Sequence, residues 1–415
     1  MMQIKLFGEV RAIPGEMEVE DCFLDADLTI CNLETPITET ENSSVKTGVR
    51  LRGRYDDFIR FVNIFKLSAR VEKKQNFVFT LANNHIGDYG PRGIGDTEKA
   101  CKKAGVAYGG VSVGNRQDPV LVETDSGKVA IFCVGERQFG VSRENVVGMD
   151  YLSAKLYTKI HRAKTEGYFV ILSVHAAAEM NLWPAPLWQE TLRSFIDAGV
   201  DVIHGHHSRV PQGWEEYHGG LIFYGLGNFL GPVSRWKRKQ NALWGLSAVV
   251  EMVDGKINRY EMVPLRLQET DGQTRVSKIN PGDADFSCTQ DYLQDANYPL
   301  EDSIFLESLW QEFSMKMHEK WFAPFMGIHA VKTENIGIRK WLKNVIYSLI
   351  GKKENVFSED KDEHFHRQVT IWYHWFSCQT HRLTAETALG ILCGEIPDMR
   401  NDKSAAMIER YFQMF

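Results

Sequence analysis

The sequence predicts an α/β protein followed by a mostly helical extension. Short apolar runs, typical of strands covered on both faces, alternate with helix-like segments between about residues 3 and 265. Two hairpin-like pairs of strands close this part of the chain. Beyond residue 267 long, aromatic-rich segments with helical periodicity predominate. We therefore predict an α/β domain at residues 1–267 and a helical region at residues 268–415.

Composition excludes several classes of protein. The 415 residues are enough for a large buried core, and a net charge of −6 argues against a nucleic-acid partner, which needs a basic face. The seven cysteines are scattered without metal-ligand spacing, which favours reduced thiols in the cytoplasm. We find no signal-like N-terminus and no apolar run of about 18 residues, so we predict a cytoplasmic chain without a membrane span.

The expected elements follow in order along the chain. Strand-like runs lie at 3–7, 27–31, 76–80, 129–135, 168–174 and 201–203, and helix-like segments lie at 93–104, 153–166 and 188–198. Gly219-Gly220 and Asp254-Gly255 are the turns of two predicted hairpins, 214–217 with 221–224 and 246–253 with 256–263. Residues 269–300 are polar and predicted to be a loop. Predicted C-terminal helices lie at 303–321, 338–350, 364–381, 385–392 and 405–415, with a charged break at 352–363.

Polar side chains follow the predicted strands where each one ends. They are Glu9, Glu34, Asn84, His85, His175, His204, His206 and His207. In an open α/β sheet, ligands bind beyond the carboxyl ends of the strands. Carboxylate, amide and imidazole groups without thiolate suit a divalent ion such as Mn, Fe or Zn, and a bridging carboxylate could hold two ions. The alternative for Glu9 is a solvated turn, and for Asn83, Asn84 and Asp88 it is turn hydrogen bonding.

An arginine comb precedes the third predicted strand. Arg50, Arg52 and Arg54 alternate along the chain, so an extended segment would put them on one side. Guanidinium groups recognise phosphate and carboxylate, which suggests an anionic substrate. A solvated edge strand is the alternative.

The order of these motifs resembles that of a known family. NLETP, LANNHIGDYG, the VH pair, DVIHGHH and IFYGLGNF together resemble the CapA family, which is associated with poly-γ-glutamate capsule synthesis. That family is similar to the calcineurin-like metallophosphoesterases. The resemblance covers about residues 3–265 and implies a sandwich with a metal site at its strand ends.

The resemblance also implies roles for individual residues. Glu34 would lie between two metal ions, and Asn84, His175 and His206 would complete one of the two sites. His85 would protonate the leaving group, and Asp88 would orient it and favour its protonated form. Glu9 and, as a substitute ligand, His204 would belong to the other site.

Three departures from the family pattern put that other site in doubt. Gly8-Glu9 replaces Gly-Asp, Ala176-Ala177 follows His175 where Trp-Gly is usual, and Arg209 stands where the last motif has its final His. Arginine cannot ligate a metal. We therefore predict that Arg209 binds an anionic substrate, together with Arg52 and Asn228.

These observations favour a metal-dependent hydrolase acting on a phosphoester or on an anionic polymer linked to capsule or poly-γ-glutamate synthesis. A second hypothesis is a catalytically weak or inactive scaffold that binds a protein partner through its C-terminal helical region. A row of uncovered tryptophans would supply that interface. They are Trp310, Trp321, Trp341, Trp372 and Trp375. A third hypothesis is a metal-dependent γ-glutamyl peptidase. The C-terminal histidines, His364, His366, His374 and His381, are predicted to be surface or core residues, because they do not share one helical face.

Overall fold

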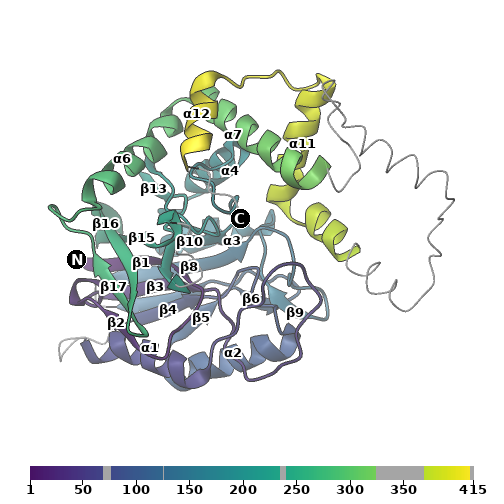
Figure 1. The fold of residues 1–415 in the computed structure, drawn as a ribbon. Helices are drawn as coiled ribbons and strands as arrows, with labels where there is room; N and C mark the ends of the chain where they lie inside the picture. The colour runs from purple at the N-terminus through teal and green to yellow at the C-terminus, as the bar shows by residue number, and fades with distance from the viewer. Residues whose placement is uncertain (69–75, 125, 234–239, 324–368, 412–415) are drawn as a thin grey trace.

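Two β-sheets packed against each other form the centre of the protein, and helices cover their outer sides (Figure 1). The computed structural model describes residues 1–68, 76–124, 126–233, 240–323 and 369–411. The mixed α/β architecture agrees with the predicted calcineurin-like sandwich followed by helices.

The first sheet has the strand order β2-β17-β16-β15-β1-β3-β4-β5, and β14 also pairs with β1. β1, β3, β4 and β5 are parallel. β15 is antiparallel to β1 and forms an antiparallel hairpin with β16. The strand bounds are β1 Met2–Val10, β2 Met17–Val19, β3 Leu28–Leu33, β4 Asn76–Thr80, β5 Ala107–Gly109, β14 Asn228–Leu230, β15 Trp244–Val253, β16 Lys256–Thr270 and β17 Gln273–Lys278.

The second sheet has the order β12-β13-β11-β10-β8-β7, and β13, β11, β10 and β8 are parallel. A separate two-stranded ribbon pairs β6 with β9. The strand bounds are β6 Val111–Val113, β7 Val120–Thr124, β8 Gly127–Gly135, β9 Val147–Met149, β10 Phe169–His175, β11 Val202–His206, β12 Trp214–Tyr217 and β13 Gly220–Phe223. Both predicted hairpins, β12-β13 and β15-β16, are confirmed.

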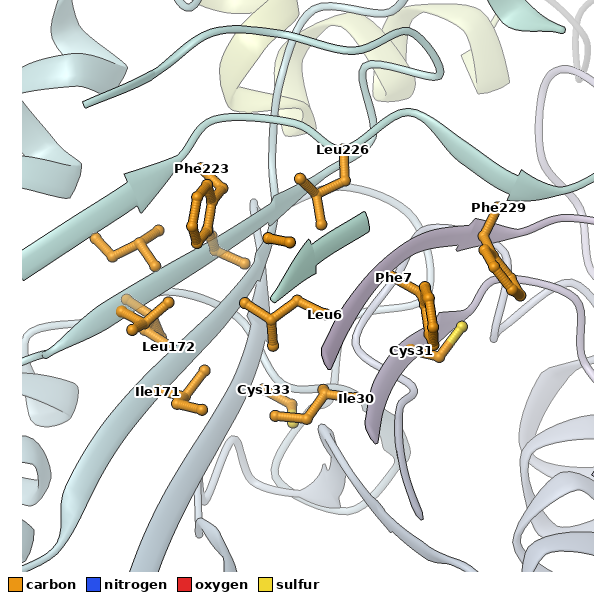
Figure 2. Packing of buried hydrophobic residues seen from close by; sticks show 14 of the residues in the cluster. Leu6, Phe7, Ile30, Cys31, Cys133, Ile171, Leu172, Phe223, Leu226 and Phe229 are labelled. Atoms are coloured by element: carbon orange, nitrogen blue, oxygen red, sulfur yellow. The ribbon is translucent and has the colours of Figure 1, made fainter. Parts of the chain in front are cut away.

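β1 is buried on both faces along most of its length, although Gln3, Lys5 and Glu9 alternate with its apolar residues. Leu6 lies among the side chains packed between the sheets, together with Leu172 and Phe223 of the second sheet (Figure 2). Phe7, the next residue, points to the opposite face. There its ring lies 5.9 Å from that of Phe65 and 4.3 Å from that of Phe229. One strand therefore joins both layers of the core.

Helices fill the two outer layers. α1 (Tyr55–Ser68) and α2 (Gly90–Ala104) lie along the first sheet, and α3 (Lys155–Thr165) and α4 (Pro186–Asp197) contact the second. α2 ends at Gly105, whose φ of 64° is the left-handed conformation expected of a helix-ending glycine. The predicted helices at 93–104, 153–166 and 188–198 are confirmed. Short 3₁₀ helices occupy Asp21–Phe23, Gln240–Ala242 and Tyr298–Glu301.

The C-terminal region forms a helical layer that continues from the second sheet. α4 contacts α7, which in turn packs against α11 and α12. In Figure 1 α7 is green, α11 and α12 are yellow, and the three helices arch over the strands. Residues 369–377 are helical and precede α11. The bounds are α6 Phe286–Asn297, α7 Ser303–Met317, a π-helical turn η4 His318–Phe322, α11 Gln379–Cys393 and α12 Asp402–Tyr411.

Two expectations for this region are wrong. Residues 269–300 are not a loop, because they contain β17 and α6, and β17 extends the first sheet past residue 267 to Lys278. Trp310 is buried, and its indole N–H donates to Thr387 Oγ1 at 3.0 Å, so it belongs to no exposed row. Trp341, His364, His366 and the segments 338–350 and 352–363 lie outside the described residues. Among the helices described, none has the length and apolar character needed to span a bilayer.

Candidate metal and anion site at the strand ends

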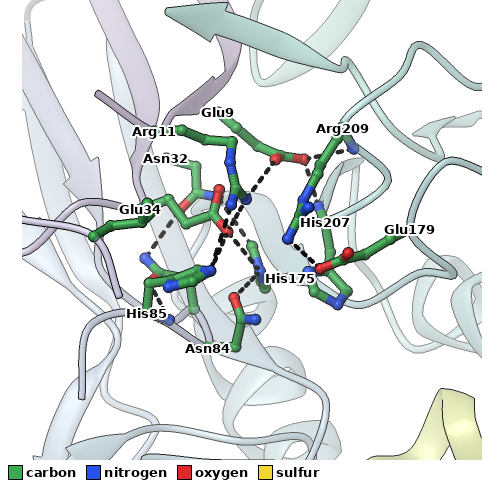
Figure 3. Close-up of polar contacts among 12 residues, drawn as sticks. Glu9, Arg11, Asn32, Glu34, Asn84, His85, His175, Glu179, His207 and Arg209 are labelled. Atoms are coloured by element: carbon green, nitrogen blue, oxygen red, sulfur yellow. Dashed lines mark hydrogen bonds and ion pairs between the residues drawn. The ribbon is translucent and has the colours of Figure 1, made fainter. Parts of the chain in front are cut away.

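Strands from both sheets end at the same place and bring their polar side chains together (Figure 3). β1, β3 and β4 of the first sheet lead to Glu9, Glu34 and Asn84, and β10 and β11 of the second lead to His175 and His207. This convergence of parallel strand ends is the arrangement that the sequence predicted.

Glu34, His175 and His207 are buried, and each offers one ligand atom within 4.8 Å of the other two. His175 Nε2 lies 3.9 Å from Glu34 Oε1 and 3.1 Å from the amide oxygen of Asn84. Asn32 Nδ2 lies 3.0 Å from His175 Nδ1 and holds the ring in place from its other side. Glu34 Oε2 is buried without a hydrogen-bond partner. This donor set fits one ion of the Zn, Mn or Fe class.

The structure places His207, rather than the predicted His206, in this group. His204 and His206 share one face of β11, and their rings lie 4.1 Å apart. His204 Nε2 contacts Phe7 O at 2.9 Å and His206 Nε2 contacts Ser173 Oγ at 3.2 Å, so both rings are held between the sheets. β11 ends at His206, and His207 turns away with a φ of 90°. The sequence identifies the run of histidines at the end of this strand, but it does not predict the backbone turn at His207.

Glu9 holds that turn in place. Its Oε1 accepts hydrogen bonds from the backbone N–H groups of His207 (2.7 Å) and Arg209 (3.2 Å), and both residues have positive φ. Successive N–H groups in such a turn form a concave anion site. Position 8 requires glycine, because the Gly227 backbone lies so close that a Cβ at Gly8 would be 1.9 Å from Gly227 O. One Glu9 oxygen is therefore committed to the backbone.

Arg11 lies between the two carboxylates and was not predicted. Its Nη1 hydrogen bonds to Glu34 Oε1 and lies 3.7 Å from Glu9 Oε2. Burial and the nearby Glu34 raise the pKa of Glu9 to about 8, although Arg11 and Arg209 oppose the rise. A guanidinium thus takes the place between two carboxylates where a second cation would otherwise sit. Its position two residues after Glu9 is the sequence signal that could have identified it.

His85 makes the predicted contact with Asp88, at 2.7 Å through Nδ1. Lys46, which sequence reasoning missed, contacts the other Asp88 oxygen at 2.5 Å. Burial, followed by the positive charges of Lys46 and Arg11, holds the pKa of His85 well below its usual value. These effects favour the neutral ring, whereas the sequence suggested that Asp88 favours the protonated one, because burial and the charges of Lys46 and Arg11 outweigh the Asp88 charge.

Arg209 forms a partly buried ion pair with Glu179 beside the candidate ligands. Burial raises the pKa of Glu179, but Arg209, His207 and Arg11 together outweigh that effect and bring the pKa to about 2. The pair borders a cavity of about 330 Å³. The cavity is lined by Arg11, Lys46, His85, Asn84, Glu179, Arg209 and His374, among others. Its wall is rich in cationic groups, as an anion-binding cavity requires.

Arg52 and Asn228, which were predicted to bind substrate, hydrogen bond to backbone oxygens and do not line this cavity. Arg52 donates to Thr40 O at 3.1 Å and lies 5.9 Å from the Tyr89 ring, and it is not among the residues that line the cavity. Asn228 donates to Arg209 O at 2.8 Å and Ala242 O at 3.0 Å, so it supports the backbone behind Arg209.

The C-terminal helices close one side of the cavity. Glu136 follows β8, and its Oε2 accepts hydrogen bonds from Thr380 N (2.7 Å) and Thr380 Oγ1 (2.8 Å) at the start of α11. An acidic group there is favourable because the N–H groups at a helix start lack helical partners. His374 lines the cavity and contacts Thr47 Oγ1 at 2.6 Å.

Similar proteins share the first part of the chain. A capsule biosynthesis protein CapA of Bacillus anthracis is 30% identical over 218 residues, which are 49% of this chain and 52% of that protein. The PGA biosynthesis protein CapA of Bacillus subtilis is 28% identical over 60% of this chain and 64% of its own length. A probable polyglutamine synthesis accessory protein of Mycobacterium tuberculosis is 26% identical over 58% and 66%. The chain thus matches between half and two thirds of each of these relatives.

A family model described as bacterial capsule synthesis protein PGA_cap matches residues 12–232, more than half of the chain. The match contains Glu34, Asn84, His175 and His207, and it ends before the C-terminal helices. Together with the sandwich fold and the relatives, the match shows that this chain belongs to the PGA_cap family of capsule synthesis proteins, within the metallophosphoesterase superfamily.

Proposed function

We propose that this protein is a metal-dependent hydrolase of a phosphoester, or of another bond in an anionic polymer or its precursor, acting in capsule or poly-γ-glutamate synthesis. The observation that carries the proposal is the meeting of Glu34, His175 and His207 within 4.8 Å, with His175 bonded to Asn84, which lines a cavity together with Arg11 and Arg209. Family membership supports the capsule association.

Two arginines would bind the substrate. Arg11 and Arg209 would hold the anionic group of the substrate, since guanidinium groups match phosphate and carboxylate geometry. Glu34, His175, His207 and Asn84 would hold the ion, which supplies Lewis-acid activation of the electrophile when bound. We assign one ion, because Arg11 already lies between Glu9 and Glu34.

The proton step belongs to His85. Its ring is neutral and Asp88 fixes Nδ1, so Nε2 can accept a proton from the attacking water. The same nitrogen then gives that proton to the leaving oxygen. Asp88 orients the ring throughout, as the third member of a catalytic triad does. His85 therefore acts first as a base, whereas the sequence suggested an acid.

The test compares two adjacent histidines. His207→Ala should lower the divalent metal content by one ion and abolish hydrolysis, whereas His206→Ala should leave the metal content unchanged. Folding of both variants is checked by circular dichroism. The proteins are assayed on a phosphodiester, a phosphomonoester and γ-glutamyl oligomers, so that the hydrolysed class identifies the bond. Equal metal content in wild type and in a folded His207→Ala variant would overturn the site assignment.

A second candidate function is binding without turnover. The Arg11 guanidinium between Glu9 and Glu34 favours it, because this cation neutralises the carboxylates without any ion. On this hypothesis the chain binds an anionic polymer equally well in chelator and in metal, and hydrolyses none of the substrates. Binding that requires the ion would exclude it.

A further inference from the structure

A second group of metal-ligating side chains lies outside the strand-end site. His374, Cys378 and His381 each offer a ligand atom within 4.8 Å of the others. They come from the turn between the helical residues 369–377 and α11, which begins at Gln379. Their spacing of four and then three residues puts them on one side of a helical path. None of them takes part in the hydrolytic steps assigned above.

We propose that His374, Cys378 and His381 bind a transition-metal ion, and that the open position of this ion faces the cavity. Two imidazoles and one thiolate form a donor set that suits Zn²⁺ and related borderline ions. A tetrahedral ion with three protein ligands keeps a fourth position for water or substrate. This donor set differs from that of the strand-end site, which has no sulfur.

The hydrogen bonds of the cluster leave its ligand atoms available. Thr47 Oγ1 contacts His374 Nδ1 at 2.6 Å, so Nε2 of that ring is available for an ion. His381 Nδ1 is buried without a hydrogen-bond partner. The His381 backbone N–H points at Cys378 Sγ at 3.5 Å, but burial and the nearby Glu136 raise the pKa of the thiol, so an ion bound there would have to displace the thiol proton. Cys378 is also the residue that caps the start of α11.

Two carboxylates lie close to the cluster and would offset the charge of an ion. Glu136 accepts hydrogen bonds from Thr380, two residues from Cys378. Glu179 interacts electrostatically with both His374 and His381. Buried cations need such compensation.

The cluster borders the same cavity as the strand-end site. His374 lines that cavity together with Arg11 and Arg209. An ion on His374 would therefore add a cationic group to the wall formed by the C-terminal region. Substrate anions would then be held from both walls. The proposal does not depend on the hydrolase assignment, because that assignment uses none of these three ligands and they lie beyond the matched family region, which ends at residue 232.

Cobalt provides a direct test, because a Co²⁺–thiolate bond gives a near-ultraviolet charge-transfer band that nitrogen and oxygen ligands do not. The full reduced chain is freed of metal with chelator and titrated with CoCl₂. We expect the band to appear and to saturate by two equivalents, because the strand-end site also takes up one cobalt ion. Cys378→Ser should abolish it and lower the bound cobalt by one ion. Cys393→Ser, the matched control at the exposed end of α11, should retain it.

A second pair of variants separates the two sites. His381→Ala should weaken cobalt binding at least tenfold, with the band reduced in proportion, while His207→Ala should leave the band intact. Circular dichroism at the same concentrations reports whether each variant is folded. Absence of the band in wild type, or its persistence in Cys378→Ser, would overturn the proposal. Loss of activity in His207→Ala with the band retained would support both sites independently.

Discussion

Two candidate ligand clusters lie near one cavity, which Asn84 of the strand-end site and His374 of the helical cluster line, and the clusters are built in different ways. Glu34, His175 and His207 come from three strand ends, lie far apart in the sequence and are buried. His374, Cys378 and His381 come from eight consecutive residues beside one helix start, and both histidines are partly exposed. The first cluster lies within the matched family region, and the second lies beyond it.

The two clusters therefore depend on different parts of the fold. The strand-end cluster exists only when both sheets have folded and paired in register, with His175 opposite His206 and Glu9 opposite Asn32. The helical cluster needs only a local turn and its attachment to Glu136. Substitutions in the sheets should therefore affect both clusters, because Glu136 follows β8 and holds the helical one. Substitutions in α11 should affect only the helical cluster.

The largest effect should come from Arg11→Met, which removes the cation between Glu9 and Glu34. Two buried carboxylates are then left facing each other, and loss of one partner of a buried pair costs about 3–5 kcal/mol. We expect urea unfolding in chelator to show this loss, and excess Mn²⁺ to restore part of it. Arg60→Met is the control, because Arg60 is an exposed partner of Asp57 and should cost under about 1 kcal/mol. Equal losses in the two variants would contradict the role of Arg11.

Arg209→Lys should have the next largest effect. Lysine keeps the charge at the cavity wall but loses the planar fork that binds phosphate or carboxylate with two hydrogen bonds. We expect KM for an anionic substrate to rise roughly tenfold to a hundredfold, with a smaller fall in kcat. Arg143→Lys, an exposed residue bonded to Tyr373, serves as the matched control. A change confined to kcat would place Arg209 in the chemical step instead of binding.

Periodicity predicted most of the fold because its central strands are continuous and apolar. The expected strand at 76–80 coincides with β4, and the helix ending at Gly105 follows from a left-handed glycine. β17 was missed because its residues are mostly polar, and only alternate ones, Thr274 and Val276, are buried. An edge strand stabilised by its neighbour carries little signal of its own.

The candidate site was predictable in outline but not in detail. Glu34, Asn84 and His175 each follow a strand, so their order along the chain places them together. The choice of His207 over His206 depends on a backbone turn, and the place of Lys46 depends on a contact with Asp88 far along the chain. The spacing of His374, Cys378 and His381 is visible in the sequence, but neither the scattered cysteines nor the four C-terminal histidines show a metal-ligand pattern by themselves.

Glu179→Gln should destabilise the protein by about 2 kcal/mol at pH 7, because the Arg209 charge then loses its partner. The pKa of Glu179 is lowered to about 2 in the folded protein, so its contribution is present above the unfolded pKa of about 4.5. That contribution is lost as the pH falls from about 4.5 towards 2. The free-energy difference between wild type and variant, from urea unfolding at pH 7, 4.5 and 3.5, should shrink in that order. A constant difference would show that the pair contributes no charge interaction.

The smallest effect should come from Thr380→Val, which tests how the helical wall is attached. The variant removes the hydroxyl hydrogen bond to Glu136 and the one that the hydroxyl accepts from Trp188 Nε1 at 3.2 Å, but it keeps the bond from the backbone N–H to Glu136, so the cost is about 1–2 kcal/mol. Because that bond holds the start of α11, amide hydrogen exchange should quicken in α11 and stay unchanged in β10. Thr191→Val, in α4, loses only a bond within its own helix and is the control. Glu136 also lies 3.8 Å from His207 Nε2, so faster exchange that reached β10 would mean that the two walls open together and that the local character of the helical cluster is wrong.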